Sequence, residues 1–360
     1  MGLFDKIFKK QEKQEVAPKG YYSLTVKELI HLTDDSIQLS FDVNSAPNGT
    51  FTYVPGQYVS IAVNINGKEE RRSYSICSGP NEPLAIAIKR VENGLVSTWA
   101  NSTVAVGDTI FVAPPQGNFT WDKSKGFVVA FAAGSGITPM LSIAKHLEQN
   151  IGEMRLYYGN KTRSTAMFLN ELGKLKNTKT NFAFSQESIE GAVRGRWTKD
   201  AVSSLIKENL TLLKADAFYV CGPEQLIKDV TDLLTMFGVA KSKIHFELFT
   251  TPVLLQNSIS EKSTEYEGDS KVRVILDDED IQLTLNSKGL SVLDALNKEG
   301  YDPPYSCKGG VCCACKAKVI EGKATMTMNF SLTDEEVAEG FVLTCQCHPA
   351  SEELVLSYDA

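Results

Sequence analysis

Short runs in which apolar and polar residues alternate dominate residues 20–120 of the chain. Examples are YYSLTVKEL, SIQLSFDV, QYVSIAV and LAIAIKRV, separated by Asn, Gly and Pro. A period of two predicts half-buried β-strands, and turn residues between the runs predict antiparallel neighbours. About six such runs in this length predict a small antiparallel β-barrel.

The pattern changes from Trp121 to alternating strands and helices, which continue over residues 121–250. The run GFVVAFA (126–132) is continuously apolar, as is typical of a parallel strand covered on both faces. It leads into GSGITP (134–139), where we expect Pro139 at the first position of the next helix. A glycine turn between strand and helix predicts an α/β, Rossmann-like nucleotide-binding domain. Later strands are expected at RLYYGN, NFAFSQ, AFYVCGP and HFELF, and helices near 165–176, 198–208 and 223–237.

Residues 251–269 lose periodicity and gain Ser, Glu and Thr, which predicts an interdomain linker. Residues 270–360 then read as an α+β β-grasp domain. Strands, one helix near SVLDALNKEG, a cysteine-rich loop and the strand KAKVIEG follow in order. A further helix should start after Thr333, with Glu336 completing a capping box. Strands are expected around Cys345 and at ELVLSY.

The first 19 residues are predicted to form a short helix and a polar tether. Leu3, Phe4, Ile7 and Phe8 fall on one helical face with lysines opposite. A membrane-surface anchor is the alternative interpretation. No apolar run in the sequence is long enough to predict a transmembrane segment.

The cysteines give the most specific chemical signal. Cys307, Cys312 and Cys315 stand as C-x4-C-x2-C, and Cys345 supplies a fourth thiol thirty residues after the third. This is the plant-type spacing for a [2Fe–2S] cluster, in which one loop provides three thiolates. We therefore predict these four residues as the metal ligands.

Two other uses of the cysteines fit less well. A structural zinc site favours two C-x2-C pairs, whereas Cys345 and Cys347 form C-x-C. A disulfide framework is typical of short secreted chains, and no signal peptide opens this sequence. We interpret Cys313 and Cys347 as non-ligands, with a ligand exchange at Cys313 left open.

Charge is distributed unevenly along the chain. The sequence holds eight cysteines and carries a net charge of −7. Residues 270–360 contain 8 Lys and Arg against 15 Asp and Glu, so the earlier residues hold 29 of each sign. An acidic C-terminal domain argues against nucleic acid and favours a basic protein partner. Free thiols and no export signal predict a cytoplasmic location.

Two motifs in the predicted barrel suit a flavin nucleotide. Arg72-Ser73-Tyr74-Ser75 offers an aromatic ring and a cation on one strand, and Gly94-Leu95-Val96-Ser97 opens a short helix after Lys89. A ring can stack on a planar heterocycle, Arg can pair with phosphate, and a helix N-terminus can bind pyrophosphate. A surface Arg and an ordinary capped helix are the alternative interpretation.

The order of these motifs resembles the ferredoxin–NADP reductase superfamily with a fused C-terminal plant-type ferredoxin. Arg72–Ser75, Gly94–Ser97, Gly134–Pro139, Cys221-Gly222-Pro223 and the cysteine loop occur in that order over nearly the whole chain. The resemblance implies three domains: an FAD-binding β-barrel, an NAD(P)-binding domain and a [2Fe–2S] ferredoxin domain.

The resemblance also implies roles for individual residues. Tyr74, Ser75, Cys221 and Phe249 would lie at the reacting flavin and nicotinamide rings. The remaining cofactor contacts would be Arg72, Lys89, Gly94, Leu95, Val96 and Ser97 for FAD, and Gly134, Gly136, Thr138, Arg163, Gly222 and Pro223 for the nicotinamide nucleotide.

The implied activity is NAD(P)H-dependent electron transfer through FAD and a [2Fe–2S] cluster to an oxygenase component. Ser185-Gln186 stands where members that select the 2′-phosphate often have Ser-Arg. Arg163, Lys161 and Arg194 could supply positive charge instead, so NADPH is favoured only slightly over NADH. The di-iron phenylacetyl-coenzyme A epoxidase is the acceptor that the resemblance favours. Another ring-hydroxylating oxygenase and hybrid cluster protein are alternatives. A non-catalytic iron–sulfur carrier or sensor is the alternative from a different class.

Overall fold

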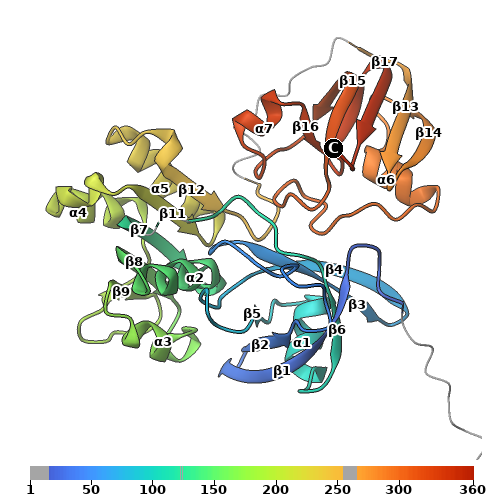
Figure 1. The fold of residues 1–360 in the computed structure, drawn as a ribbon. Coiled ribbons are helices and arrows are strands. Elements are labelled where there is room, and N and C mark those ends of the chain that lie inside the picture. The colour runs from blue at the N-terminus through green and yellow to red at the C-terminus, as the bar shows by residue number, and fades with distance from the viewer. Residues whose placement is uncertain (1–15, 122, 124, 254–265) are drawn as a thin grey trace, which may run out of the picture.

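A computed structural model describes residues 16–121, 123, 125–253 and 266–360. The chain forms three bodies, a barrel, an α/β domain and a C-terminal α+β domain, which meet around the cysteine loop (Figure 1). The predicted N-terminal helix and the centre of the predicted linker fall outside the described residues. Within the described part of the chain, no helix is both long and apolar enough to cross a membrane.

The first body is the predicted antiparallel barrel. Its sheet has the strand order β4-β3-β6-β1-β2-β5, and the bridge between Ile76 and Ile86 joins the two ends. Alternate residues such as Val59, Ile61 and Ile86 fill its interior. The elements are β1 (Tyr22–Thr33), β2 (Ser36–Asp42), β3 (Tyr58–Ile65), β4 (Lys68–Ser75), β5 (Ala85–Lys89), α1 (Leu95–Thr103) and β6 (Thr109–Val112).

The second body has a parallel sheet with the strand order β10-β9-β8-β7-β11-β12. Strand β7 is buried on both faces, as its continuous apolar run predicts. Val128 faces the cluster that contains α2, and Val129 faces the cluster that contains α4 and α5. The elements are β7 (Lys125–Ala133), α2 (Ile137–Glu148), β8 (Ile151–Asn160), α3 (Leu169–Lys174), β9 (Thr178–Phe184), β10 (Val193–Arg194), α4 (Lys199–Glu208), β11 (Ala217–Cys221), α5 (Glu224–Met236) and β12 (Ile244–Glu247), with 3-10 turns η1 (Gly134–Gly136), η2 (Arg163–Thr165), η3 (Leu210–Lys214) and η4 (Lys241–Lys243).

Two helix predictions in this body were wrong in detail. Helix α2 begins at Ile137, which places Pro139 at its third position. The helix starts early because the 3-10 turn of residues 134–136 already has helical backbone angles at Gly136. The helix expected near 165–176 is split into η2 and α3 by Phe168, which has a left-handed backbone (φ 63°).

The third body is a mixed five-stranded sheet with one helix packed on it, as expected for a β-grasp. Its strand order is β14-β13-β17-β15-β16, with β13 and β17 parallel. The predicted capping box of Thr333 and Glu336 is present at α7. Cys345, however, lies in the turn between β16 and β17 and not on a strand. The elements are β13 (Asp269–Leu276), β14 (Glu279–Asn286), α6 (Val292–Lys298), β15 (Lys316–Met326), α7 (Asp334–Ala338), β16 (Phe341–Leu343) and β17 (Cys347–Ser357).

Candidate functional site

The four cysteines with cluster spacing lie together as two pairs. Cys312 Sγ is 3.1 Å from Cys307 Sγ, and the thiols of Cys315 and Cys345 lie close enough to shift the pKa of one another. Cys312, Cys315 and Cys345 are buried, and Cys307 is half-buried. The turn that follows β16 therefore brings the distant fourth thiol to the loop.

Two pairs of thiols suit two metal ions better than one. Among the residues described, no three His, Cys, Asp or Glu side chains converge on a point that could hold a single ion. A tetrahedral zinc site would require four ligands around one point. A [2Fe–2S] cluster takes four cysteines in total, which two pairs provide as two thiolates for each iron. The donor set thus fits the cluster.

Backbone N–H groups surround the sulfur atoms of this loop. The pKa of the Cys307 thiol is lowered to about 6. The hydrogen bond with the Cys312 thiol has the largest effect, and the backbone N–H groups of Gly309, Val311 and Cys312 add to it. Burial of the side chain acts in the opposite direction. Lys308 and Gly310 have left-handed backbones (φ 54° and 70°), which turn successive N–H groups inward. Such donors stabilise negative charge on sulfur.

The cysteine loop is covered by both other bodies. The Tyr58 ring from the barrel packs on Cys312 and Ala314. Val311 packs against the core between the parallel sheet and helices α4 and α5. The loop therefore lies at the meeting point of the three bodies (Figure 1).

A second set of groups lies where the barrel meets the carboxyl edge of the parallel sheet. Ser75, the last residue of β4, donates a hydrogen bond of 3.1 Å from its Oγ to Glu247 Oε2 on β12. Glu247 pairs in parallel register with Cys221, the last residue of β11. Burial raises the pKa of the Glu247 carboxyl to about 7, although the Ser75 hydroxyl opposes this shift. A carboxyl with such a pKa can hold or release a proton near neutral pH.

Cys221 is fully buried beside this carboxyl. Burial and then the charge of Glu247 raise the pKa of its thiol well above the usual range. The residue is therefore a neutral thiol at the sheet edge and not a nucleophilic thiolate.

The residues predicted for the flavin lie on β4 and at the start of α1. Ser75 is buried, and Tyr74 is half-buried beside it. Arg72 is exposed and pairs with Glu70 at 3.1 Å. Lys89 donates from its Nζ to the carbonyl oxygen of Thr165, which links the barrel to the nucleotide-binding body.

Helix α1 begins directly after Gly94, as predicted. A Cβ at Gly94 would lie 2.6 Å from Ser97 Oγ, so glycine keeps this turn compact. Ser97 Oγ accepts from the backbone N–H of Val91 and donates to the carbonyl oxygen of Gly94. Leu95 is exposed and Val96 is buried in the barrel core. The binding groups of this turn are therefore the backbone N–H groups at the start of α1, and a helix N-terminus of this kind fits a pyrophosphate.

The residues predicted for the nicotinamide nucleotide gather at the carboxyl ends of β7 and β11. A Cβ at Gly136 would lie 2.1 Å from the carbonyl oxygen of Cys221, so only glycine allows the two loops to approach. Gly222 packs closely on Ala133, and Pro223 is the residue before α5. Thr138 is buried and donates from its Oγ1 to the carbonyl oxygen of Ser135. This edge is where α/β sheets bind ligands.

Two predicted residues lie further out. Arg163 is exposed, and its backbone N–H donates to Glu187 Oε2 at 2.6 Å. Phe249 lies two residues beyond the end of β12 and is 43% exposed.

Glu247, Tyr58 and Arg71 were not predicted from the sequence. Glu247 lies within HFELF, but its partner Ser75 is 172 residues away, so no local pattern connects them. Arg71 lies in the charged run KEERR of β4, and the sequence does not show that Glu70 and Arg71 are the two buried residues of that run.

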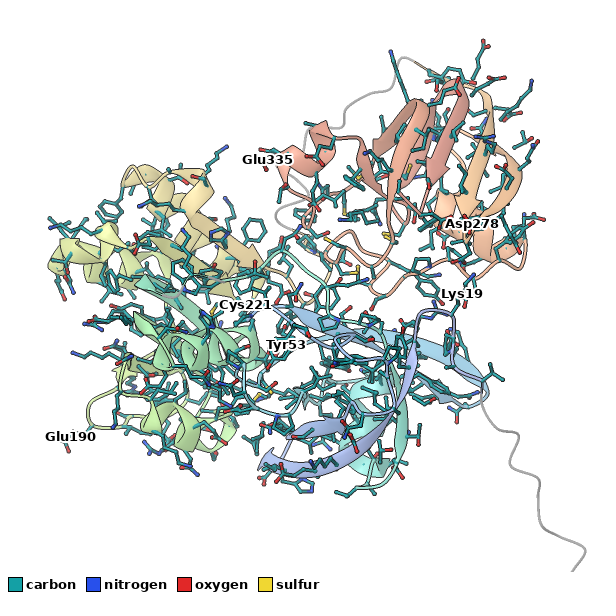
Figure 2. All side chains as sticks on the ribbon, viewed as in Figure 1. Lys19, Tyr53, Glu190, Cys221, Asp278 and Glu335 are labelled. Carbon is teal, nitrogen blue, oxygen red and sulfur yellow. The ribbon has the colours of Figure 1, made fainter. Side chains whose placement is uncertain are left out.

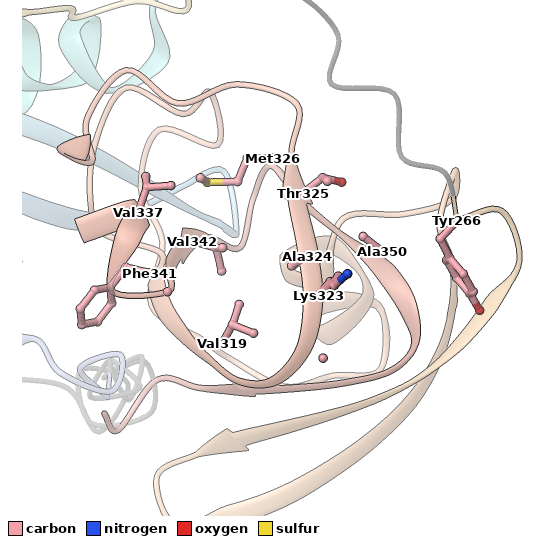
Figure 3. A pocket seen from close by; sticks show the side chains of 12 residues that line it. Tyr266, Val319, Lys323, Ala324, Thr325, Met326, Val337, Phe341, Val342 and Ala350 are labelled. Atoms are coloured by element: carbon pink, nitrogen blue, oxygen red, sulfur yellow. The ribbon is translucent and has the colours of Figure 1, made fainter. Parts of the chain in front are cut away.

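A cavity of about 650 Å³ opens on the C-terminal body (Figure 3), and its lining residues Met326 and Phe341 also pack against the cluster that contains Cys315 and Cys345. Tyr266, Met326, Val337 and Phe341 are among its lining residues, and Lys323 is the only charged residue among the described ones that line it. This apolar lining offers no acid or metal ligand among those residues, so we do not assign chemistry to it.

Known proteins resemble this chain in each of the three bodies. Residues 23–121 match the oxidoreductase FAD-binding domain family, residues 131–232 the oxidoreductase NAD-binding domain family, and residues 274–350 the 2Fe-2S iron-sulfur cluster binding domain family.

Two curated relatives match nearly end to end. One component of the 1,2-phenylacetyl-CoA epoxidase of Escherichia coli (strain K12) is 35% identical and covers 94% of this chain and 98% of its own. The ferredoxin reductase component of 3-ketosteroid-9-alpha-monooxygenase from Rhodococcus rhodochrous is 29% identical, over 93% and 96%.

Solved structures share the same arrangement. Phthalate dioxygenase reductase superposes with a TM-score of 0.58 at 25% identity, over 94% of this chain and 98% of its own. An intact type IV self-sufficient cytochrome P450 monooxygenase gives a TM-score of 0.70 at 22% identity, over 93% of this chain and 41% of its own, and shares the fold. The predicted three-domain architecture is therefore confirmed.

Proposed function

The chain belongs to the family of flavin- and iron–sulfur-dependent reductases that includes the reductase component of 1,2-phenylacetyl-CoA epoxidase, and on this basis we propose that it delivers electrons from NAD(P)H to the oxygenase component of such an epoxidase. The three bodies are accordingly an FAD domain, an NAD domain and a ferredoxin domain. The observation that carries the proposal is the cysteine loop, which lies against both the FAD domain and the NAD domain.

The order of the cofactors follows from the number of electrons that each of them exchanges in one step. FAD would take two electrons from the nicotinamide as one hydride and pass them on singly, because a [2Fe–2S] cluster accepts one electron at a time. The residues of this chain would hold each cofactor in place. The cluster would be held by Cys307, Cys312, Cys315 and Cys345. Tyr74 and Ser75 would face the flavin ring, and the α1 N-terminus would receive the FAD pyrophosphate. Arg72 and Lys89 would supply positive charge to the same nucleotide.

The nicotinamide nucleotide would bind across the carboxyl edge of the parallel sheet. Gly134, Gly136 and Thr138 would line the pyrophosphate, with Arg163 at the adenosine end and Cys221, Gly222 and Pro223 at the nicotinamide end. Phe249 would lie beside the flavin ring. Glu247, joined to Ser75, would hold a proton beside the reacting rings.

We place the protein in the cytoplasm. All eight cysteines are free, and four of them are required as thiolates for the proposed cluster. A reducing compartment keeps such thiols available.

The experiment that tests the proposal uses the purified full-length chain, loaded with FAD and cluster. Anaerobic addition of NADPH or NADH should bleach the flavin absorbance and then produce the paramagnetic signal of a reduced [2Fe–2S] cluster. The reduced protein should then be reoxidised by phenylacetyl-CoA epoxidase oxygenase in the presence of substrate and oxygen.

Competing functions give different results in the same experiment. Reoxidation by hybrid cluster protein or by a ring-hydroxylating oxygenase, with none by the epoxidase, would replace the proposed acceptor. A cluster signal without nicotinamide-dependent flavin bleaching would favour a simple iron–sulfur carrier.

A further inference from the structure

Tyr58 connects the FAD domain to the cysteine loop, and neither the family assignment nor the predicted motifs gives it a role. It is the first residue of β3, and its side chain is 4% exposed. Its hydroxyl accepts a hydrogen bond of 3.2 Å from the backbone N–H of Cys313. The bonded N–H therefore belongs to the residue directly after the ligand candidate Cys312.

The backbone of Tyr58 is fixed on both sides. It pairs with Ser75 across β3 and β4. It also exchanges two backbone hydrogen bonds of 2.9 Å with Gln116 on its other side. Tyr58 is thus held directly opposite Ser75, the residue that contacts Glu247. Its ring extends from strands β3 and β4 to the cysteine loop.

The ring is confined as well as the backbone. Gly117 has φ 108°, and a Cβ there would come within 2.9 Å of two ring atoms of Tyr58. On the other side, the ring packs with Cys312 and Ala314, and Cys307 lies against the same cluster. The hydroxyl therefore reaches the Cys313 N–H without rotational freedom.

The loop has separate attachments within its own domain. Ser331 Oγ donates to the carbonyl oxygen of Cys312, and Cys313 Sγ donates to the carbonyl oxygen of Ser331. These contacts attach the loop to its own domain independently of Tyr58. The Tyr58 hydroxyl acts between domains, so its loss should change docking more than ferredoxin folding.

We propose that Tyr58 is a positioning residue for electron transfer between the flavin and the cluster, a role that rests on the proposed function. Its ring and hydroxyl hold the Cys312–Ala314 segment against the strand pair of Ser75. By accepting the Cys313 N–H, the hydroxyl also fixes a backbone donor in the same loop as the Gly309 N–H that donates to Cys307 Sγ. Hydrogen bonds to sulfur set the potential of such clusters.

The test compares Tyr58→Phe with Tyr53→Phe in the full-length holoprotein. Tyr53 is a second barrel tyrosine whose hydroxyl bonds to Ser78 and Gly79 and not to the cysteine loop. Stopped-flow absorbance would separate flavin reduction by the nicotinamide from the following cluster reduction. Paramagnetic resonance and a redox titration would report the cluster itself.

For Tyr58→Phe we expect flavin reduction within about twofold of wild type and cluster reduction about tenfold slower. The g-values of the reduced cluster and its midpoint potential should shift. Tyr53→Phe should leave cluster reduction, g-values and potential unchanged. A second variant, Tyr58→Leu, removes the ring and should slow cluster reduction further while the protein retains its flavin and cluster.

Three outcomes would overturn the proposal. Cluster reduction and g-values equal to wild type in Tyr58→Phe would show that the tyrosine only fills space. Equal effects in Tyr58→Phe and Tyr53→Phe would indicate general destabilisation of the barrel. Slower flavin reduction with unchanged cluster reduction would place Tyr58 at the wrong step. If wild-type protein itself shows no nicotinamide-driven flavin bleaching, the proposed function fails independently of Tyr58.

Discussion

Arg71 of the FAD domain and Asp302 of the ferredoxin domain form an ion pair of 2.6 Å across the interface. The guanidinium also pairs with Glu69 at 2.6 Å and lies over the Tyr305 ring, 4.5 Å from its centroid. Arg71 is 3% exposed, whereas the Asp302 side chain is 49% exposed. A guanidinium that is buried in the assembled chain thus joins the barrel to one carboxylate of the ferredoxin domain.

Asp302→Asn should loosen this docking without unfolding either domain. Hydrogen bonds to charged groups contribute about 1.5–3 kcal/mol, and the half-exposed carboxylate lowers the expected loss to about 1 kcal/mol. We expect internal cluster reduction to slow and to become more sensitive to salt. Stopped-flow measurements at two ionic strengths would detect both effects.

The matched control is Asp277→Asn, which breaks the pair between Lys19 and Asp277 at the same interface. Both side chains of that pair are exposed, so its loss should change little. Figure 2 shows Lys19 beside the ferredoxin domain, near Asp278. Equal effects of the two substitutions would mean that burial of Arg71 gives it no special role.

Glu247 should make both stability and turnover depend on pH. Its carboxyl has a pKa of about 7 in the folded protein, against an ordinary value of 4.5. Between these values the folded state binds more protons than the unfolded state, so the free energy of unfolding falls as pH rises from about 4.5 to 7. Above about pH 7 this contribution is constant.

Glu247→Gln should remove that pH dependence, which thermal unfolding at a series of pH values from about 5 to 8 would measure. Flavin reduction should slow by roughly a hundredfold if the carboxyl transfers a proton, since acid–base groups contribute at least this factor. Ser75→Ala, which removes the hydrogen bond that lowers the Glu247 pKa, should extend the pH dependence to higher pH. Unfolding profiles with the same slope in wild type and Glu247→Gln would contradict the assignment.

Single Cys→Ser substitutions should distinguish the ligands from their neighbours. Changing Cys307, Cys312, Cys315 or Cys345 should abolish or strongly perturb the cluster signal, because each pair would lose one thiolate. Cys347→Ser should preserve the signal, because Cys347 is fully buried in the β-grasp core. Iron and sulfide content with paramagnetic resonance would measure this. A full cluster in Cys345→Ser and none in Cys347→Ser would reverse the assignment.

The preference of the protein for NADPH or NADH should depend on Glu187. This carboxylate lies just after β9, where it accepts the backbone N–H of Arg163. In our proposal Arg163 lies at the adenosine end, where a carboxylate favours a ribose 2′-hydroxyl and repels a 2′-phosphate. Glu187→Gln should therefore raise the NADPH-to-NADH ratio of kcat/KM about fivefold, which corresponds to about 1 kcal/mol of repulsion.

Glu190→Gln is the control for Glu187, because it changes an exposed acid in the same loop (Figure 2). Its nucleotide ratio should match wild type. An unchanged ratio in Glu187→Gln would leave Lys161 and Arg194 as the residues to test next.

The parts of the structure that sequence could predict are those with a local cause. Alternation predicted the barrel strands, and the apolar run at 126–132 predicted a strand buried on both faces. The capping box at Thr333 was also correct because it involves only residues three apart. Cys345 was wrongly expected on a strand, since the turn between β16 and β17 has no strong turn residue to mark it.

What sequence could not predict depends on contacts between distant segments. Ser75 and Glu247, Tyr58 and Cys313, and Arg71 and Asp302 are separated by 172, 255 and 231 residues. No periodicity or spacing links such pairs, because the packing of whole domains brings them together. Burial of a charged side chain, as at Arg71, becomes visible only in the folded protein and marks such an interface.

The acidic residues at the start of α7 are candidates for the surface that docks the electron acceptor. Asp334, Glu335 and Glu336 begin α7, and the first two are exposed. Glu336 accepts from Asn118 of the FAD domain at 2.8 Å and from Lys316 at 3.1 Å. Neutralising Glu336 would therefore disturb internal docking as well as any acceptor surface.

We expect Asp334→Asn with Glu335→Gln to slow electron delivery to the acceptor several-fold at low salt. Exposed charges steer association and are screened over about 8 Å at physiological ionic strength, so added salt should remove the difference from wild type. Reduction of flavin and cluster by the nicotinamide should not change. Asp278→Asn with Glu279→Gln is the matched control, because Figure 2 shows Asp278 on the opposite side of the domain from Glu335. Equal slowing by both double variants would indicate a general effect of net charge, and delivery indifferent to salt and to both would leave the acidic residues as an ordinary solvated surface.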